Sequence, residues 1–339
     1  MIGSFDEAWL GLVQEDVLDP ALPIVDPHHH LWQHGRRYLL DELLADLADG
    51  HRVVATVFCQ SEYGYLAEGP QALRPVGETA LMAGLAEQAR RQGVRTQVCA
   101  GILGYADLQL GDAVLPVLQA HIEAAAGRFR GVRHVAARHD AFSVRMAYQP
   151  AAALLADPMF RKGLAQLQAL GLVFEAWVYH PQLAEVLALA RAMPGLAIVL
   201  NHCGGPLAAG PYRGKRAEVF PVWRDAMRQL AACPNVVVKL GGLGMPIGGF
   251  DFHKQPRPPT SQELVDAWRP YMEPCLEDFG ASRCMFESNF PVDKAMLGYR
   301  VLWNAYKKLA AGTSSADRAG LFHQTAARVY RLNLPRAGQ

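Results

Sequence analysis

Two histidines near the start of the chain have the spacing of a small binding site. Residues 23–32 read P-I-V-D-P-H-H-H-L-W, so a short apolar run leads into an aspartate and three histidines. Side chains alternate along a strand, so His28 and His30 should share one face while His29 points away. Two imidazoles on one face can hold a cation or an anionic substrate group. A solvated turn rich in histidine has the same pattern, and the place of the pair at the end of the first apolar strand is what favours a site.

Other groups that bind, titrate or polarise also follow short apolar runs. They recur along the chain as Arg133 and His134, Tyr179 and His180, Asn201 and His202, Lys239, then Glu287, Ser288 and Asn289, and finally Asp293. The segment 241–260 is rich in glycine and proline and adds His253 and Lys254. A loop of that length in a compact domain is more often functional than idle.

The segments between these residues predict how they are positioned. The expected strands open at Ile24 and then cover Arg52–Gln60, Thr96–Leu103, Phe129–Ala137, Val173–Tyr179, Ala197–Leu200, Val236–Leu240 and Cys284–Phe290. Apolar residues at helical spacing predict helices over Tyr38–Asp49, Pro75–Gln92, Val114–Ala126, Pro158–Gly171, from Pro181, over Val222–Ala232, from Thr260, over Leu297–Ala311 and over Asp317–Tyr330.

Eight short strands that alternate with helices predict an α/β fold with a parallel sheet buried on both faces. Eight such units in about 300 residues favour a single-domain (β/α)8 TIM barrel over residues 23–335, preceded by a lead-in segment, 1–22. An open doubly wound sheet is the alternative, but no glycine-rich turn follows the first strand. Because the active sites of barrels lie at the carboxyl ends of the strands, the polar groups above predict one small-molecule enzyme site.

Composition excludes several other classes of protein. The chain has 339 residues, 51% of them hydrophobic, and a net charge of +1 without a basic block, so neither nucleic acid nor an anionic membrane is an expected partner. Six cysteines lack C-x-x-C spacing, and the first residues lack the pattern of a signal peptide, which favours reduced thiols in the cytoplasm. The expected partner is a small-molecule substrate; a homo-oligomer is compatible with the sequence, which does not specify the oligomeric state.

Some of these residues also have a purely structural interpretation. Asp26 can hold the end of the first strand through backbone hydrogen bonds, and His134 can be a satisfied core histidine. His180 precedes a proline and can simply end its strand, and Trp32 can serve packing. His202, between an apolar strand and two glycines, is harder to explain without a function.

Several segments, taken in order, resemble the blocks of the amidohydrolase-2 family. They are D-P-H-H-H-L-W, G-V-R-H, F-E-A-W-V-Y-H-P-Q-L, L-N-H-C-G-G-P, V-V-V-K-L-G-G and M-F-E-S-N-F-P-V-D. The resemblance covers nearly the whole chain and is strongest to the branch of sugar-lactone and 2-pyrone-4,6-dicarboxylate lactonases. It implies a barrel hydrolase of small carbonyl compounds in which His28, His30 and His202 form the histidine set and Arg133 grips the substrate. We expect Trp32, Tyr179, His180 and His253 to contact substrate as well.

The eighth-strand block departs from the family pattern. The family normally ends this strand with G-S-D-W-P, whereas this chain has E-S-N-F-P, so Asn289 stands where the aspartate is expected. An amide cannot act as a base and is a weak metal ligand. Glu287 and Asp293 are the alternative carboxylates. The catalytic set is therefore expected among His202, Glu287, Asn289 and Asp293, with the general base left open.

The resemblance also leaves the cofactor and the reaction open. His28, His30 and His202 with one acid would suit Zn²⁺ or Mn²⁺, yet the branch includes metal-independent lactonases, so a metal-bound and a metal-free site both remain. We expect a hydrolase of a small, oxygen-rich carbonyl compound, most simply a lactone. The alternatives are a decarboxylase or hydratase on the same barrel, and a binding pseudoenzyme silenced by Asn289.

Overall fold

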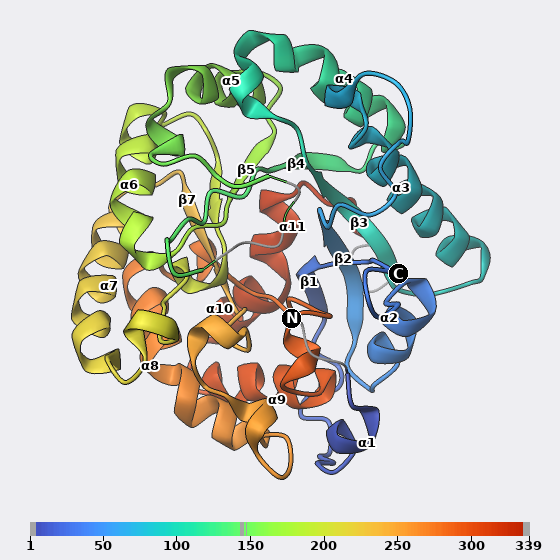
Figure 1. The fold of residues 1–339 in the computed structure, drawn as a ribbon. Coiled ribbons are helices and arrows are strands. Elements are labelled where there is room, and N and C mark those ends of the chain that lie inside the picture. The colour runs from blue at the N-terminus through green and yellow to red at the C-terminus, as the bar shows by residue number, and fades with distance from the viewer. Residues whose placement is uncertain (1–4, 143–145, 147, 335–339) are drawn as a thin grey trace.

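Eight parallel strands form a barrel that helices surround (Figure 1). The computed structural model describes residues 5–142, 146 and 148–334; the first four residues of the expected lead-in segment and residue 335 lie outside this part. The strands follow one another around the sheet in chain order, β1 to β8. The barrel closes where the Asn289 N–H donates to the His28 carbonyl (2.9 Å) and the His30 N–H donates to the Phe290 carbonyl (2.7 Å). The predicted (β/α)8 fold is confirmed.

The strands are short and almost wholly buried. They are β1 (Ile24–His29), β2 (Val53–Cys59), β3 (Gln97–Gly104), β4 (Phe129–Arg133), β5 (Val173–Ala176), β6 (Ile198–Leu200), β7 (Val236–Leu240) and β8 (Cys284–Phe286). β4, β5 and β8 end earlier than predicted, because the chain leaves the sheet at the polar residues that form the mouth of the barrel.

Helices surround the barrel and close one end of it. They are α1 (Glu7–Leu10), α2 (Leu40–Leu47), α3 (Val76–Arg91), α4 (Leu115–Ala124), α5 (Pro158–Ala169), α6 (Leu183–Ala192), α7 (Arg216–Ala231), α8 (Ser261–Phe279), α9 (Tyr299–Leu309), α10 (Ser315–Ala319) and α11 (Thr325–Val329). The helix expected from Thr260 is α8, which begins with a capping box between Thr260 and Glu263.

Two helices differ from their predicted extents. α7 begins at Arg216, six residues before the predicted start, and keeps Pro221 inside it. A proline interrupts the backbone hydrogen bonding of a helix, which is why the sequence alone favoured a start after Pro221. The last predicted helix is divided, since a π-helical turn over Gly320–Gln324 separates α10 from α11.

The core has two layers. The larger layer lies between the strands and the surrounding helices. The smaller layer fills the inside of the barrel, where Val25, Val57 and Met285 pack against Ala326 and Tyr330 from the C-terminal segment. α11 thus closes the end of the barrel at which the strands begin, and the other end can hold an active site (Figure 1).

The lead-in segment packs on the outside of the fold. The Trp9 indole N–H donates to the Gln255 carbonyl (3.0 Å), and Lys307 on α9 donates to the Leu18 carbonyl (2.7 Å). In the described chain, no helix combines the length and apolarity needed to cross a membrane.

Two histidines outside the mouth make the fold sensitive to acid. Burial lowers the pKa of His121 and of His134 from 6.5 to about 4. His121 is held between the Thr79 hydroxyl (2.8 Å) and the Tyr105 carbonyl (2.9 Å), so it is neutral in the folded state. In the unfolded chain each of these histidines is protonated below about pH 6.5. In the folded chain each stays neutral until the pH falls to about 4.

We therefore expect the free energy of unfolding to fall as the pH drops through 6.5, by about 1.4 kcal/mol per pH unit for each such histidine. Urea denaturation at pH 5 and pH 7 measures this slope. His121→Gln should make the slope shallower by one histidine's share, whereas the same change at the exposed His34 is the control. Equal slopes in all three proteins would contradict the assignment.

Candidate active site

Three imidazoles converge at the mouth of the barrel. Nε2 of His28 lies 3.2 Å from Nε2 of His30, and the rings of His28 and His202 have centroids 4.7 Å apart. All three side chains are buried, although they come from strand ends far apart in the sequence. The predicted alternation in β1 is confirmed, since His29 points the other way and bonds the Thr56 hydroxyl at 2.9 Å.

The tautomer of His30 follows from its partner. Its Nδ1 lies 2.8 Å from the Cys59 carbonyl oxygen, which can only accept, so Nδ1 carries the proton and Nε2 carries a lone pair. Burial lowers the pKa of both His28 and His30 well below the usual value, so both rings are neutral at pH 7. Nε2 of His28 lies 3.2 Å from this lone pair of His30.

Glu287 joins two of the imidazoles. Its Oε1 accepts from Nδ1 of His202 at 2.7 Å, and its Oε2 lies 2.9 Å from Nδ1 of His28. The second contact is out of line for a hydrogen bond, which leaves Oε2 as a buried oxygen without a partner in the described chain. The carboxylate fixes the tautomer of His202, so that Nε2 of this ring is free to take a proton or bind a metal.

Arg133 lies over the histidine pair. Its Nη1 is 3.2 Å from Nε2 of His28, and its Nη2 donates to both the backbone and the side-chain oxygen of Gln60. Gln60 thereby holds the guanidinium at the end of β4 with one face toward the imidazoles. A fixed guanidinium in this place can stabilise negative charge on a substrate oxygen.

A second ionic group lies beneath the imidazoles. Lys239 on β7 donates to Oε2 of Glu175 on β5 at 2.8 Å, and both side chains are fully buried. The Lys239 ammonium also lies 3.2 Å from Nδ1 of His28. Tyr330 and Asn201 donate further hydrogen bonds to the Glu175 carboxylate. The pair therefore connects the floor of the site to the C-terminal segment that closes the barrel.

Two glycines let the backbone lie close to these side chains. A Cβ on Gly242 would lie 2.2 Å from Nδ1 of His202, and one on Gly241 would lie 2.4 Å from Cγ of Glu287. His202 and Asn289 both have φ of +54°, a left-handed conformation that is uncommon outside glycine and concentrates at functional sites. Asparagine tolerates this conformation better than most residues.

Asn289 and Asp293 form a pair of their own. The Asn289 amide donates to Oδ1 of Asp293 at 2.9 Å, and the Gly244 N–H donates to Oδ2 at 3.1 Å. Burial raises the pKa of Asp293 to about 8. Both oxygens of Asp293 are engaged by this pairing, whereas Glu287 contacts the imidazoles directly, so Glu287 is the better placed of the two alternative carboxylates.

The residues expected to contact substrate differ in how they are placed relative to the imidazoles. Trp32 stacks on His30 with ring centroids 5.5 Å apart, and Tyr179 contacts Trp177, which packs edge-on against His202. His180 accepts from the Leu207 N–H at 3.2 Å.

His253 lies in a short 3-10 turn of the loop after β7, and its Nδ1 is 3.4 Å from the Met296 sulfur. It is exposed. Its contact with substrate stays a prediction. Asp26 has the structural role considered for it, because it accepts from the Ser288 N–H (3.0 Å) and the Tyr299 hydroxyl (3.0 Å).

The donor set fits a divalent cation. Ligand atoms of His28, His202 and Glu287 all lie within 4.8 Å of one another, and His30 adds its Nε2 lone pair. The unpartnered Oε2 of Glu287 is the observation that favours this set. His28, Cys59 and Glu175 are equally close, but the Lys239 ammonium lies against Glu175, and burial raises the pKa of the Cys59 thiol to about 11.

Two buried charges of the site could have been recognised in part from the sequence. Glu175 and Lys239 stand inside apolar strands, V-F-E-A and V-V-V-K-L, and buried charges of opposite sign need each other. Gln60 and the Cys59 carbonyl carried no such signal, since their roles depend on where β2 ends relative to Arg133 and His30.

The comparisons with known proteins agree with this geometry. A family model described as Amidohydrolase matches residues 25–332. The chain belongs to the amidohydrolase family. The family's enzymes and this site together identify the protein as an enzyme of the hydrolase type.

Relatives of this amidohydrolase include proteins named for lactone hydrolysis. The chain is 33% identical to the uncharacterized protein y4mH of Sinorhizobium fredii, over 92% of this chain and 99% of that protein. It is 29% identical to an L-fucono-1,5-lactonase of Burkholderia multivorans, over 92% of this chain and 97% of the relative. A crystal structure of an amidohydrolase from Burkholderia multivorans with bound zinc has a TM-score of 0.68 at 27% identity, with 92% of this chain and 99% of that chain covered.

Replacing Asn289 by the aspartate of the family pattern should destabilise this amidohydrolase. Asn289→Asp places two buried carboxyls at the distance of the present hydrogen bond, 2.9 Å. Like charges this close cannot both ionise, so the free energy of unfolding should drop by about 1–3 kcal/mol at pH 8 and by less at pH 5, where one proton is shared.

The double change Asn289→Asp and Asp293→Asn is the matched control. The introduced amide can donate to the new carboxylate and still accept from the Gly244 N–H, so stability should recover. Urea denaturation of the three variants at both pH values measures the effect. A single variant as stable as the natural chain at pH 8 would show that the two side chains are not coupled.

Proposed function

We propose that this amidohydrolase hydrolyses a small polyhydroxylated lactone of the sugar 1,5-lactone class. The observation that carries the proposal is the Glu287 carboxylate bound to Nδ1 of His202, with Arg133 and the His28–His30 pair beside it. A buried base, an orienting carboxylate and a fixed cation are the parts that water attack on an ester carbonyl needs. The relatives named L-fucono-1,5-lactonase support the class of substrate.

The reaction begins with a water held next to His202. Nε2 of His202 takes a proton from the water as its oxygen attacks the lactone carbonyl carbon, and Glu287 stabilises the imidazolium that forms. Arg133 donates to the carbonyl oxygen as it becomes negative. The ring C–O bond then breaks, His202 returns the proton to the departing ring oxygen, and an open-chain hydroxy acid leaves.

A divalent metal fits the same residues. His28, His30, His202 and Glu287 are the residues that would hold it, and a bound Zn²⁺ would polarise the carbonyl and lower the pKa of water. The buried neutral state of His28 and His30 suits this role, because a protonated imidazole cannot bind a metal.

The test is a panel of sugar 1,5- and 1,4-lactones, simple esters and aromatic carboxylic acids, assayed by proton release and by loss of the carboxyl group. Each assay is run on protein as purified, after chelator, and after addition of Zn²⁺ or Mn²⁺. We expect turnover of lactones above all others. Release of CO₂ from an aromatic acid would favour the lyase alternative, and no turnover in any metal state would favour a binding protein.

A cytoplasmic location is part of the same proposal. The six cysteines are free and buried, as expected where thiols stay reduced.

A further inference from the structure

A cavity lies at the opposite end of the barrel from the histidines. It has a volume of about 400 Å³ and is formed by the end of α3, the starts of β3 and β4 and the C-terminal segment. Cavities of a few hundred cubic ångströms are large enough for a small metabolite. This end of the barrel contributes nothing to the proposed hydrolysis, so the cavity needs its own explanation.

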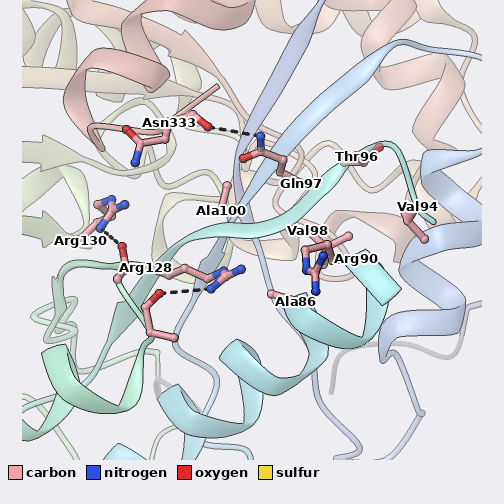
Figure 2. Close-up of a pocket in the computed structure, with 12 residues that line it drawn as sticks. Ala86, Arg90, Val94, Thr96, Gln97, Val98, Ala100, Arg128, Arg130 and Asn333 are labelled. Carbon is pink, nitrogen blue, oxygen red and sulfur yellow. Dashed lines mark hydrogen bonds between the residues drawn. The ribbon is translucent and has the colours of Figure 1, made fainter. Parts of the chain in front are cut away.

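Arginines dominate the polar lining of this cavity. Figure 2 shows Arg128 between Arg130 on one side and Arg90 on the other, with Gln97 and Asn333 across from them. Among the lining residues that the structure describes, none is acidic. The lining thus offers several positively charged N–H donors to a ligand in the cavity.

These guanidiniums are only partly satisfied by the protein. Arg130 donates through Nη1 to the carbonyls of Gly127 (2.8 Å) and Phe129 (2.9 Å), and Arg128 donates to the carbonyl of Ala126 (3.3 Å). Within the described chain neither of them forms an ion pair, in contrast to Arg90, which binds Glu87 through two hydrogen bonds of 2.8 Å. Nε of Arg130 is shielded from solvent and has no hydrogen-bond partner there.

The positive charges also act on one another. Burial lowers the pKa of Arg130, and the charges of Arg331 and Arg128 lower it further. An anion among these cations would remove the repulsion and supply the missing acceptor for Nε.

We propose that this cavity binds a phosphate-bearing small molecule, with Arg128 and Arg130 gripping the phosphate and Gln97 and Asn333 contacting the remainder. Guanidiniums match phosphate oxygens through paired N–H donors, which is why arginine rather than lysine suits such a site. The volume exceeds what phosphate alone needs, so the natural ligand carries an organic part. This site is independent of the proposed lactone hydrolysis and lies at the far end of the barrel.

The test is isothermal titration calorimetry of the full chain with inorganic phosphate at constant ionic strength, with chloride as the competing salt. The double variant Arg128→Gln/Arg130→Gln should weaken phosphate binding about tenfold or more, the loss expected from a charge-assisted hydrogen bond. Arg95→Gln, the same change at an exposed arginine before β3 that does not line the cavity, should bind as the natural chain does.

A second variant guards against a folding defect in the first. Ala126→Glu adds a negative charge at an exposed lining position and keeps every arginine, so it should abolish phosphate binding while circular dichroism and the melting temperature stay unchanged. Binding that survives in both cavity variants would place phosphate elsewhere, for instance on Arg133, and overturn the proposal. Absence of measurable binding to the natural chain would show solvated arginines only and would overturn it too, without affecting the hydrolase proposal.

Discussion

Glu287→Gln is expected to lower kcat/KM for lactone hydrolysis by about 10³-fold while the protein stays folded. The amide has the size of the carboxylate, but one of its two ends can only donate. Oε1 of Glu287 accepts from Nδ1 of His202 at 2.7 Å, and an amide in this place can keep that hydrogen bond at most. His202 then loses the negative charge that stabilises the imidazolium.

The measurement is kcat and KM against pH. Loss of the dyad should appear mainly in kcat, because the interaction with the imidazolium exists only while His202 holds the transferred proton. Glu78→Gln is the control, since Glu78 is also fully buried but accepts hydrogen bonds from Ser61 and Tyr63 instead of the imidazoles. If Glu287→Gln kept kcat/KM within about tenfold of the natural enzyme, Glu287 would not support the base, and the neighbouring pair of Asn289 and Asp293 would need re-examination.

The barrel could be predicted because each of its strands is marked by a local sequence pattern, and the pattern repeats along the chain. Short apolar runs predicted the strands, and the carboxyl ends of parallel strands must share one end of a barrel, so His28, His30 and His202 could be brought together without a structure. The alternation expected along the first strand even predicted which two of the three successive histidines, His28 to His30, face each other.

The role of Glu287 could be predicted only in outline. The sequence made it one of two alternative carboxylates on a strand expected to continue to Phe290, but β8 ends at Phe286 and the chain turns, with Asn289 at positive φ. That turn directs Glu287 between two imidazoles. Its position depends on closure of β8 against β1, a contact between residues more than 250 apart in the sequence, which no local pattern encodes.

The conformation of the long loops was the other feature that could not be predicted from the sequence. The segment 241–260 was expected to be functional because of its length, and in the structure Phe252–Lys254 forms a 3-10 turn in which His253 contacts Met296. The lead-in segment reaches the same loop through Trp9, so contacts from the start of the chain help to shape it. Such contacts leave no periodic signal in the loop itself.

Lys239→Met is expected to lower the free energy of unfolding by about 3–5 kcal/mol, because it leaves a buried carboxylate without its counter-charge. Lys239 and Glu175 are both fully buried and joined at 2.8 Å. Tyr330 and Asn201 still donate to Glu175 after the change, but neither carries a charge. Urea denaturation at pH 7 measures the loss.

The double variant Lys239→Met/Glu175→Gln separates the charge from the packing. Removing both charges should cost less than Lys239→Met alone, since a neutral buried pair needs no counter-ion, and the coupling energy from the four proteins should be about 2 kcal/mol or more. If the losses in the free energy of unfolding were independent and additive, the ion pair would not be what stabilises the interior of the barrel.

Activity is the second readout. The Lys239 ammonium lies 3.2 Å from Nδ1 of His28, so the double variant should regain stability while kcat stays reduced. That outcome would show that one lysine both balances Glu175 and positions the imidazole at the mouth.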